Sequence, residues 1–304
     1  MLDIAIIGGG PAGLSAGLYA ARGGTDATLY EELFAGGQAA KTERIDNYPG
    51  FPDGLDGYSV GALIEQQATR FGLNISYESV SGLNLTAPEK QILFASGEKV
   101  SAKTIILCMG ATPRKLGLPE EQRLTGAGIS YCATCDGAFF KEKDVAVVGG
   151  GDTALSDALY LARFCSSVTV IHRRDSLRAA AALQKAALED PKIHFLWDSV
   201  ATALQGETKL TGLTVQNLKT KLDSRSAVSG VFVAVGIMPR TALVKEQLAL
   251  AGNGSIQTDG RMQTNVPGVF AAGDIRNTPL RQVVTACADG AVAATSALEY
   301  LQTL

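Results

Sequence analysis

Two cysteines separated by two residues are the strongest chemical signal in this 304-residue chain. Cys132 and Cys135 can close a small disulfide, and a helix that begins there would depress a thiol pKa. Half of a zinc site is a competing interpretation, but such a site needs two further ligands at suitable spacing. The other three cysteines are isolated, and the chain has only two histidines. We therefore predict a redox-active dithiol and no metal site, with a pair of buried thiols as the simpler alternative.

A carboxylate follows the second cysteine directly. Asp136 could exchange protons with a thiol as a general acid or base, or it could simply cap a helix. The remaining cysteines each lie in an apolar setting: Cys108 ends a β-like run, Cys165 follows a helical pattern, and Cys287 lies in an alanine-rich helical pattern. We predict that these three are core residues.

An internal repeat organises the chain around these groups. Residues 8–32 and 149–173 align without gaps, and 10 of the 25 positions are identical. Each copy follows a continuous apolar run, at residues 4–7 and 145–148, as expected of parallel strands covered on both faces. A β-turn-α-β unit used twice predicts an α/β fold with two Rossmann-like three-layer dinucleotide-binding domains.

The glycine turn of the first copy fits the G-x-G-x-x-G fingerprint. Its residues are Gly8, Gly10, Pro11, Ala12 and Gly13. The glycines permit a tight turn and let backbone amides approach a pyrophosphate at the positive end of the helix. Glu31 lies 23 residues after the first glycine, near the spacing expected of a carboxylate that binds ribose hydroxyls. This copy predicts FAD or NAD, and a glycine turn without a ligand is the simpler alternative.

The second copy carries a G-x-G-x-x-A variant and the opposite charge. Its turn consists of Gly149, Gly151, Asp152, Thr153 and Ala154. The position equivalent to the first copy's glutamate is His172, and Arg173, Arg174 and Arg178 follow it. A cationic cluster in place of a carboxylate favours a 2′-phosphate, so this copy predicts NADPH. A solvated basic loop is the alternative.

A third segment returns to the first site late in the chain. A β-like run ends in Gly273 and Asp274, and this aspartate could accept hydrogen bonds from a sugar-alcohol chain or could cap a helix. A helical pattern begins near Arg281, Gln282 and Val283. The positive end of that helix could face an anionic reduced flavin.

Two buried β-like runs end in Gly and Pro, and these are candidate domain crossings. They divide the chain into a discontinuous FAD-binding domain, residues 1–112 and 242–304, and an inserted NADPH-binding domain, residues 113–241, that carries the dithiol. Within the inserted domain, residues 206–229 are rich in Thr, Lys, Ser and Asp and predict an antiparallel hairpin.

Net charge, hydrophobic runs and cysteine count limit the classes of binding partner and the cellular compartment that we expect. The net charge is −3 and the pI about 5.5, so there is no basic field to hold nucleic acid or a membrane surface. No run approaches the ~18 apolar residues that span a bilayer, and residues 1–10 lack the pattern of a signal peptide. An odd cysteine count argues against a secreted disulfide scaffold. We expect a cytoplasmic protein.

Taken together, these motifs resemble the low-molecular-weight bacterial-type thioredoxin reductases, in the class II pyridine nucleotide-disulfide oxidoreductase family, over the whole chain. Besides the motifs above, the shared residues include Gly37, Gln38 and Asn47. The resemblance implies a homodimer with one FAD and one NADPH per chain, and places these three residues at the FAD. It also implies that Cys135 lies next to the flavin, whereas Cys132 exchanges with the disulfide of a thioredoxin or a thioredoxin-like protein.

Two departures and three rival functions accompany the resemblance. Cys108 lies in Cys-Met-Gly where the family often has Ala-Thr-Gly, and Arg240 stands where Asn is common. A dithiol oxidase of related fold would not need the arginine cluster, and a ferredoxin- or flavodoxin-type NADP reductase would not need the cysteine pair. A redox sensor would consume no NADPH. The family and the domain map also predict a rotation of the domains during turnover.

Overall fold

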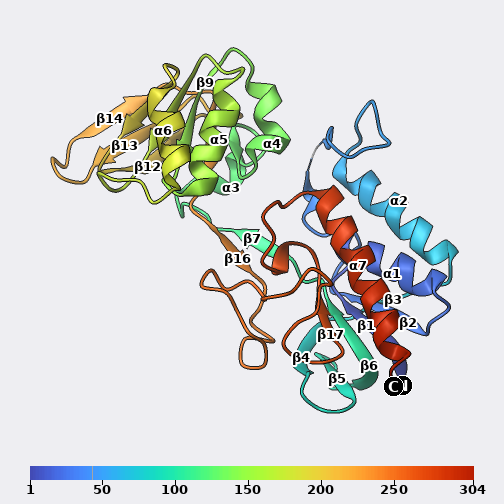
Figure 1. Cartoon of the computed structure of the whole chain (residues 1–304). Helices are drawn as coiled ribbons and strands as arrows, with labels where there is room; N and C mark the ends of the chain where they lie inside the picture. Colours follow the sequence, from blue (N-terminus) through green and yellow to red (C-terminus); the bar gives the residue numbers. More distant parts are fainter. Residues whose placement is uncertain (43) are drawn as a thin grey trace. The chain divides into compact units, whose positions relative to one another are not determined.

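The computed structural model describes residues 1–42 and 44–304, and the chain divides into two compact units (Figure 1). The first unit combines Met1–Thr112 with Met238–Leu304, and the second is Pro113–Ile237. The second boundary thus falls four residues before the predicted one, because the exiting chain forms a strand, β16 (Ile237–Pro239), that pairs with β7 (Ala111–Pro113).

A mixed sheet forms the centre of the first unit, in the order β3-β2-β1-β6-β5-β4 with β17 paired to β6. Its strands are β1 (Leu2–Ile7), β2 (Ala27–Glu31), β3 (Asn74–Tyr77), β4 (Val80–Asn84), β5 (Lys90–Phe94), β6 (Lys99–Leu107) and β17 (Val269–Ala271). Strands β1, β2, β3, β6 and β17 pair in parallel, whereas β5 pairs antiparallel with both of its neighbours, β6 and β4. The carboxyl ends of β1, β6 and β17 therefore meet at one edge, where Gly8, Cys108 and Ala272 follow them.

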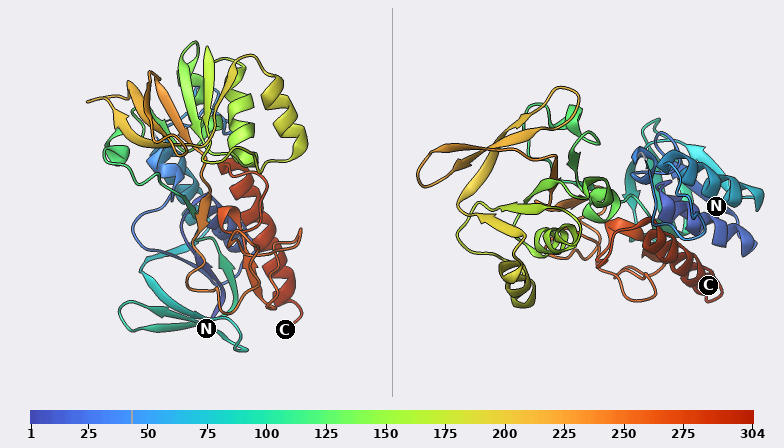
Figure 2. Two further views of the ribbon diagram at one scale, coloured as in Figure 1. Left: turned by 90° about the vertical axis from the view of Figure 1, so that its left-hand side faces the viewer. Right: turned by 90° about the horizontal axis from the view of Figure 1, so that it is seen from above.

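Helices α1 (Pro11–Arg22), α2 (Gly57–Arg70) and α7 (Val283–Leu301) cover this sheet, and short 3-10 turns lie at η1 (Ala39–Lys41) and η3 (Gly273–Ile275). The red helix α7 packs along the blue helix α1 in Figures 1 and 2. Gly290 allows this approach, because a Cβ there would overlap the carbonyl oxygen of Ala12. Alanines of α7, such as Ala293 and Ala297, are fully buried in the shared core. The last helix of the chain thus supports the first glycine turn.

The second unit repeats the design with a parallel sheet in the order β11-β10-β9-β15-β8. Its strands are β8 (Ile129–Ser130), β9 (Asp144–Val148), β10 (Ser167–Ile171), β11 (Ile193–Leu196) and β15 (Gly230–Val233). Its helices are α3 (Glu121–Leu124), α4 (Ala133–Asp136), α5 (Asp152–Ala162) and α6 (Ala181–Glu189), with a 3-10 turn, η2 (Gly137–Phe140). Val145 and Val147 of β9 and Val168 and Val170 of β10 are buried in one core with α5, as the repeat predicts.

An antiparallel sheet extends the second unit through β12 (Ser199–Gln205), β13 (Gly212–Asn217) and β14 (Asp223–Ser226). The hairpin predicted within residues 206–229 is confirmed, since β13 and β14 pair antiparallel. Across both described stretches of the chain, no helix combines the length and hydrophobicity needed to cross a membrane.

Candidate active site: a disulfide and two nucleotide turns

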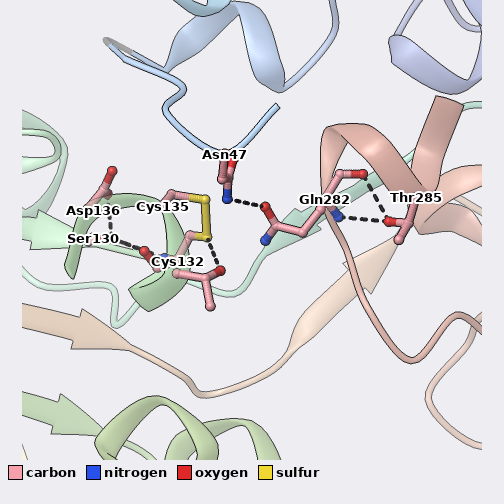
Figure 3. The surroundings of a disulfide bond; sticks show 8 residues. Asn47, Ser130, Cys132, Cys135, Asp136, Gln282 and Thr285 are labelled. Carbon is pink, nitrogen blue, oxygen red and sulfur yellow. Dashed lines mark hydrogen bonds between the residues drawn. A yellow bond between two sulfur atoms is a disulfide. The ribbon is translucent and has the colours of Figure 1, made fainter. Parts of the chain in front are cut away.

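Cys132 and Cys135 form a disulfide at the start of α4 (Figure 3). Cys132 is the N-cap residue of this short helix, and the two Cα atoms are 5.3 Å apart. The hydroxyl of Thr134 lies 3.4 Å from Cys132 Sγ. The cysteine pair therefore has the geometry that reversible disulfide formation requires.

Asp136, the carboxylate expected to handle protons, is held by a serine that sequence reasoning missed. Ser130 Oγ donates to Asp136 Oδ2 at 2.6 Å and accepts from the Cys132 amide at 3.0 Å. Ser130 is only 4% exposed at the end of β8. The Ser-x-Cys spacing was the available signal, because serine hydroxyls commonly bond the backbone two residues on.

A second unpredicted group, Glu121 of α3, anchors the residue just before the dithiol. Its buried carboxylate accepts the amides of Leu116 and Gly117 and the hydroxyl of Tyr131, each at 2.8 Å. Burial, together with this hydrogen bond, raises the pKa of Tyr131 to about 12. In sequence Glu121 resembles a solvated surface acid, so its role emerges only from the fold.

The remaining cysteines are packed as predicted. Cys108 and Cys165 are buried and Cys287 is partly buried, all with free thiols. Burial raises the pKa of Cys165 to about 11 and also raises the pKa of Cys287. These thiols are therefore protonated near neutral pH. Among residues 1–42 and 44–304, no cluster of three or more His, Cys, Asp or Glu could hold a metal ion.

The first glycine turn is hydrogen-bonded to the carboxylate of Glu31, in the same repeat. Gly9 N–H donates to Glu31 Oε2 at 2.6 Å, from the end of β2. A Cβ at Gly13 would overlap the carbonyl oxygen of Gly8, so that fingerprint position requires glycine. Among the described residues, a Cβ at Gly10 would meet only Gly37 Cα, at 3.9 Å, which leaves room for a ligand at the start of α1. Pro11 opens that helix, where its missing N–H costs nothing.

The late segment of the chain lies against this turn. A Cβ at Gly273 would stand 2.9 Å from Ala12 Cβ, so the two backbones approach closely. Asp289 of α7, which was not predicted, accepts Gly273 N–H and the guanidinium of Arg276, both at 3.1 Å. Burial raises the pKa of Asp274, with Arg281 opposing the shift and Asp289 adding to it. The acidic side chain predicted to meet a sugar-alcohol chain is thus held on a braced turn.

The residues expected near the start of α7 are also brought together. Asn47 Nδ2 donates to Gln282 Oε1 at 3.0 Å, although 235 residues separate them (Figure 3). Gln282 is the N-cap residue of α7, which begins at Val283, and it forms a capping box with Thr285 in the first turn. Gln38 is at the N-cap position of η1, next to Gly37, whose φ of +56° suits glycine.

The imidazole ring of His172 lies against the second glycine turn, where the first turn has a carboxylate. A Cβ at Gly150 would overlap the imidazole of His172, which is 4% exposed. Arg178 N–H donates to Gly150 O at 2.8 Å, and Asp152 Oδ1 accepts Ala180 N–H at 2.7 Å. No atom lies within 4 Å of a Cβ built at Gly151, among the residues described. This turn, followed by Thr153 and the buried Ala154, also leaves room at its helix start.

His172 differs from its predicted place in the cationic cluster. Burial lowers its pKa, and three arginines lower it further, against a hydrogen bond from Nε2 to Ser176 O that raises it. The imidazole is therefore neutral near neutral pH and lies beneath the turn. The positive charge comes from Arg173, Arg174 and Arg178, which are exposed. The repeat alignment places His172 opposite Glu31, whereas the burial of its ring follows only from the fold.

Comparison with known proteins decides the family. The pyridine nucleotide-disulphide oxidoreductase family matches residues 2–290. This chain belongs to that family. It is 45% identical over 304 residues to the thioredoxin reductase of Streptomyces clavuligerus, covering 99% of this chain and 94% of that relative. It is 39% identical over 303 residues to the thioredoxin reductase of Bacillus subtilis (strain 168), covering 99% and 95%.

Solved structures agree with the sequence relatives. The crystal structure of thioredoxin reductase from Streptococcus pyogenes MGAS5005 is similar at a TM-score of 0.91 and 41% identity, over 100% of this chain and 99% of that one. The predicted α/β fold with Rossmann-like domains is confirmed, as is the resemblance to bacterial-type thioredoxin reductases.

Membership in this pyridine nucleotide-disulphide oxidoreductase family implies a flavin and a nicotinamide nucleotide. The residues at hand fit such groups. Arg281 Nε is buried without a hydrogen-bond partner among the described residues, and a buried donor in that state calls for an acceptor from elsewhere. The open helix starts at Gly10 and Gly151 are suited to phosphates.

Proposed function

We propose that this chain is an NADPH-dependent, FAD-containing thioredoxin-disulfide reductase. The observation that carries the proposal is the Cys132–Cys135 disulfide beside Asp136, in a unit whose nucleotide turn is followed by exposed arginines. Whole-length similarity to thioredoxin reductases supports it.

FAD would be held by the first unit. The amides at the start of α1 would face the pyrophosphate, and Glu31 would meet the ribose hydroxyls. The other proposed contacts come from the Gly36–Gly37 turn, from the loop before α2, and from α7 with the segment before it: Gly37, Gln38, Asn47, Gly273, Asp274, Arg281, Gln282 and Val283. Arg281 Nε–H, which has no partner among the described residues, would donate to an acceptor of the cofactor. When bound, FAD would supply the two electrons that reduce the disulfide.

NADPH would be held by the second unit. The proposed residues are Gly149, Gly151, Asp152, Thr153, Ala154, His172, Arg173, Arg174 and Arg178. In this set the arginines would bind the 2′-phosphate through charge-assisted hydrogen bonds. His172 would act from beneath, by supporting Gly150. A neutral ring suits that buried place better than a charged one.

Thiol-disulfide exchange would complete the cycle through this chain's own sulfurs. Cys132 would attack the partner's disulfide and Cys135 would resolve the mixed disulfide, while Asp136 moves protons. The dithiol and the NADPH turn lie in one unit and the FAD turn in the other, so we propose that the units reorient during turnover. A cross-link that pins the units and leaves turnover unchanged would refute that motion. We also propose a homodimer, to be checked by light scattering.

The test is an anaerobic titration of the FAD-loaded protein with NADPH, followed by addition of oxidised thioredoxin. We expect the flavin to bleach and thioredoxin to be reduced, with Cys132→Ser and Cys135→Ser each abolishing the second step. Cys165→Ala is the matched control, because that thiol is free and buried and donates to the carbonyl oxygen of Phe140. Bleaching by NADPH without reduction of thioredoxin would instead favour an oxidase or a flavodoxin-type reductase.

A further inference from the structure

Ser130 occupies a position that the exchange chemistry does not by itself explain. It is a buried polar residue, 4% exposed, on the two-residue strand β8 that leads into the dithiol. Its hydroxyl contacts both the carboxylate of Asp136 and the peptide of Cys132 (Figure 3). Asp136 is six residues away along the chain, so this link closes the loop that contains both cysteines.

The hydroxyl of Ser130 has one hydrogen to give, and the distances show where it goes. Asp136 Oδ2 lies 2.6 Å away, whereas the other candidate acceptor, Cys132 O, lies 3.2 Å away. A separation of about 2.5–2.7 Å is typical of a hydroxyl donating to an ionised carboxylate. The serine oxygen in turn accepts the Cys132 amide at 3.0 Å. Amide, hydroxyl and carboxylate therefore form one polarised chain.

We propose that Ser130 is a positioning residue for proton transfer at the dithiol: its hydroxyl holds the Asp136 carboxylate, in its ionised form, in fixed relation to Cys132. This inference rests on the proposed role of the dithiol in exchange. When Asp136 takes up a proton, the serine hydrogen can turn to Cys132 O, which is its second acceptor. The same hydroxyl thus serves both states of the acid.

The exchange step balances with Asp136 as carrier. The Cys132 thiolate attacks one partner sulfur, a mixed disulfide forms, and the partner's S–S bond breaks. Cys135 then attacks Cys132 Sγ, which re-forms the internal disulfide and releases the second partner sulfur. The dithiol loses two electrons and two protons, and the partner's two sulfurs gain the two electrons and the two protons. Asp136 accepts a proton from a thiol of the pair and passes it to a leaving partner sulfur.

In any pH measurement, the ionisation of other groups near α4 must be distinguished from that of Asp136. The elements packed most closely on α4 are η2, which has no charged residue, and α5, which carries Asp152 and Asp157. Asp152 is engaged by Ala180 N–H. Burial raises the pKa of Asp157 to about 7. Glu121 binds the hydroxyl of Tyr131, beside Cys132.

The experiment measures the dithiol directly, without NADPH. The full-length protein is reduced chemically, freed of reductant, and mixed with a colorimetric aromatic disulfide over the pH range in which it stays folded. The chain offers a matched control: Ser167 Oγ also donates to an aspartate, Asp144, at 2.6 Å in the same unit. The variants are Ser130→Ala, Ser130→Thr, Ser167→Ala and Asp136→Asn, with Asp157→Asn to assign its separate ionisation.

The rate–pH profile should contain one step that is absent in Asp136→Asn. In Ser130→Ala we expect the midpoint of this step to rise by about one pH unit, a tenfold change in proton affinity, because the ionised carboxylate has lost its hydrogen-bond donor. Ser130→Thr keeps the hydroxyl and should restore the profile, and Ser167→Ala should not move it. Thermal unfolding of each variant verifies folding. A uniform loss of rate at every pH in Ser130→Ala, or an equal shift in Ser167→Ala, overturns the proposal. The step requires neither cofactor nor thioredoxin, so failure of the reductase function itself would show separately.

Discussion

The two nucleotide turns share one backbone design and differ at one decisive position. In both, the residue 23 positions after the first glycine returns to the middle glycine of the turn: Glu31 bonds Gly9, and His172 lies against Gly150. The first partner is an acceptor for the turn, whereas the second is a neutral ring with arginines behind it. In the proposed function, the backbone of each turn would hold the phosphates, and the residue at the end of its second strand would select the nucleotide.

The repeats also differ inside their helices. The third fingerprint position is Gly13 in α1 but Ala154 in α5, and the buried Ala16 of α1 corresponds to Asp157 in α5. In the first unit α7 packs directly on α1, which demands small residues. Close packing of α7 at Gly290 suits the small Ala16, whereas Gly13 is required by the carbonyl oxygen of Gly8 in its own turn. Variants at these pairs test the comparison.

The largest effect should come from Gly13→Ala. The new methyl would overlap Gly8 O, and such overpacking costs on the order of 3 kcal/mol in unfolding free energy. We expect poor folding and loss of FAD on purification, measured by thermal unfolding and by the flavin-to-protein absorbance ratio. The reciprocal change, Ala154→Gly, should cost only about 1 kcal/mol. Equal effects would show that the two turns are interchangeable at this position.

Removal of the arginines should affect the second turn alone. Arg173→Ala with Arg178→Ala should raise the KM for NADPH roughly 100-fold, because two hydrogen bonds to a charged phosphate are lost. The KM for NADH should change little. Steady-state kinetics with both nucleotides measures this, and Arg225→Ala on β14 is the control. A parallel rise for NADH would mean that the arginines do not read the 2′-phosphate.

A smaller effect is expected at the first turn. Glu31→Ala removes the acceptor for Gly9 N–H and for Leu33 N–H, and also the proposed ribose contact. We expect FAD to bind about tenfold more weakly, as followed by flavin fluorescence on titration of the apoprotein. The neighbouring Glu32→Ala should leave binding unchanged. If both substitutions weaken binding equally, general charge and not the contact at Gly9 is responsible.

The smallest effect concerns Asp157 and pH. Its pKa is raised by burial from 3.8 to about 7, so between these values the folded state holds a proton that the unfolded state has released. Stability therefore falls as the pH rises through this window. Asp157→Asn should raise the free energy of unfolding by about 1 kcal/mol at pH 8 and should hardly change it at pH 4. The value at pH 8 is set below the full effect of the pKa shift because Asp157 is partly exposed to solvent. Urea unfolding at both pH values measures this, with Glu207→Gln as control; a pH-independent difference would contradict the assignment.

Much of the site could be predicted from the sequence because its signals are local. Spacing within one turn gives the cysteine pair and both glycine fingerprints, and charge type gives the contrast between Glu31 and the arginines. Backbone sterics favour glycine at Gly8, where the first turn needs a φ of +104°. The apolar runs and the repeat likewise predicted the Rossmann-like sheets before any packing was known.

Only the tertiary structure decided which side chains complete the site. It brings Asn47 to Gln282 across 235 residues, braces Gly273 with Asp289, and buries His172. It also closes Ser130 onto Asp136. Hydrogen bonds and burial of this kind depend on how separate segments pack, and a side chain's type does not reveal its eventual neighbours. The sequence therefore determined the turns, the charges and the dithiol, whereas packing determined protonation and orientation, because those depend on desolvation and on the nearest partner.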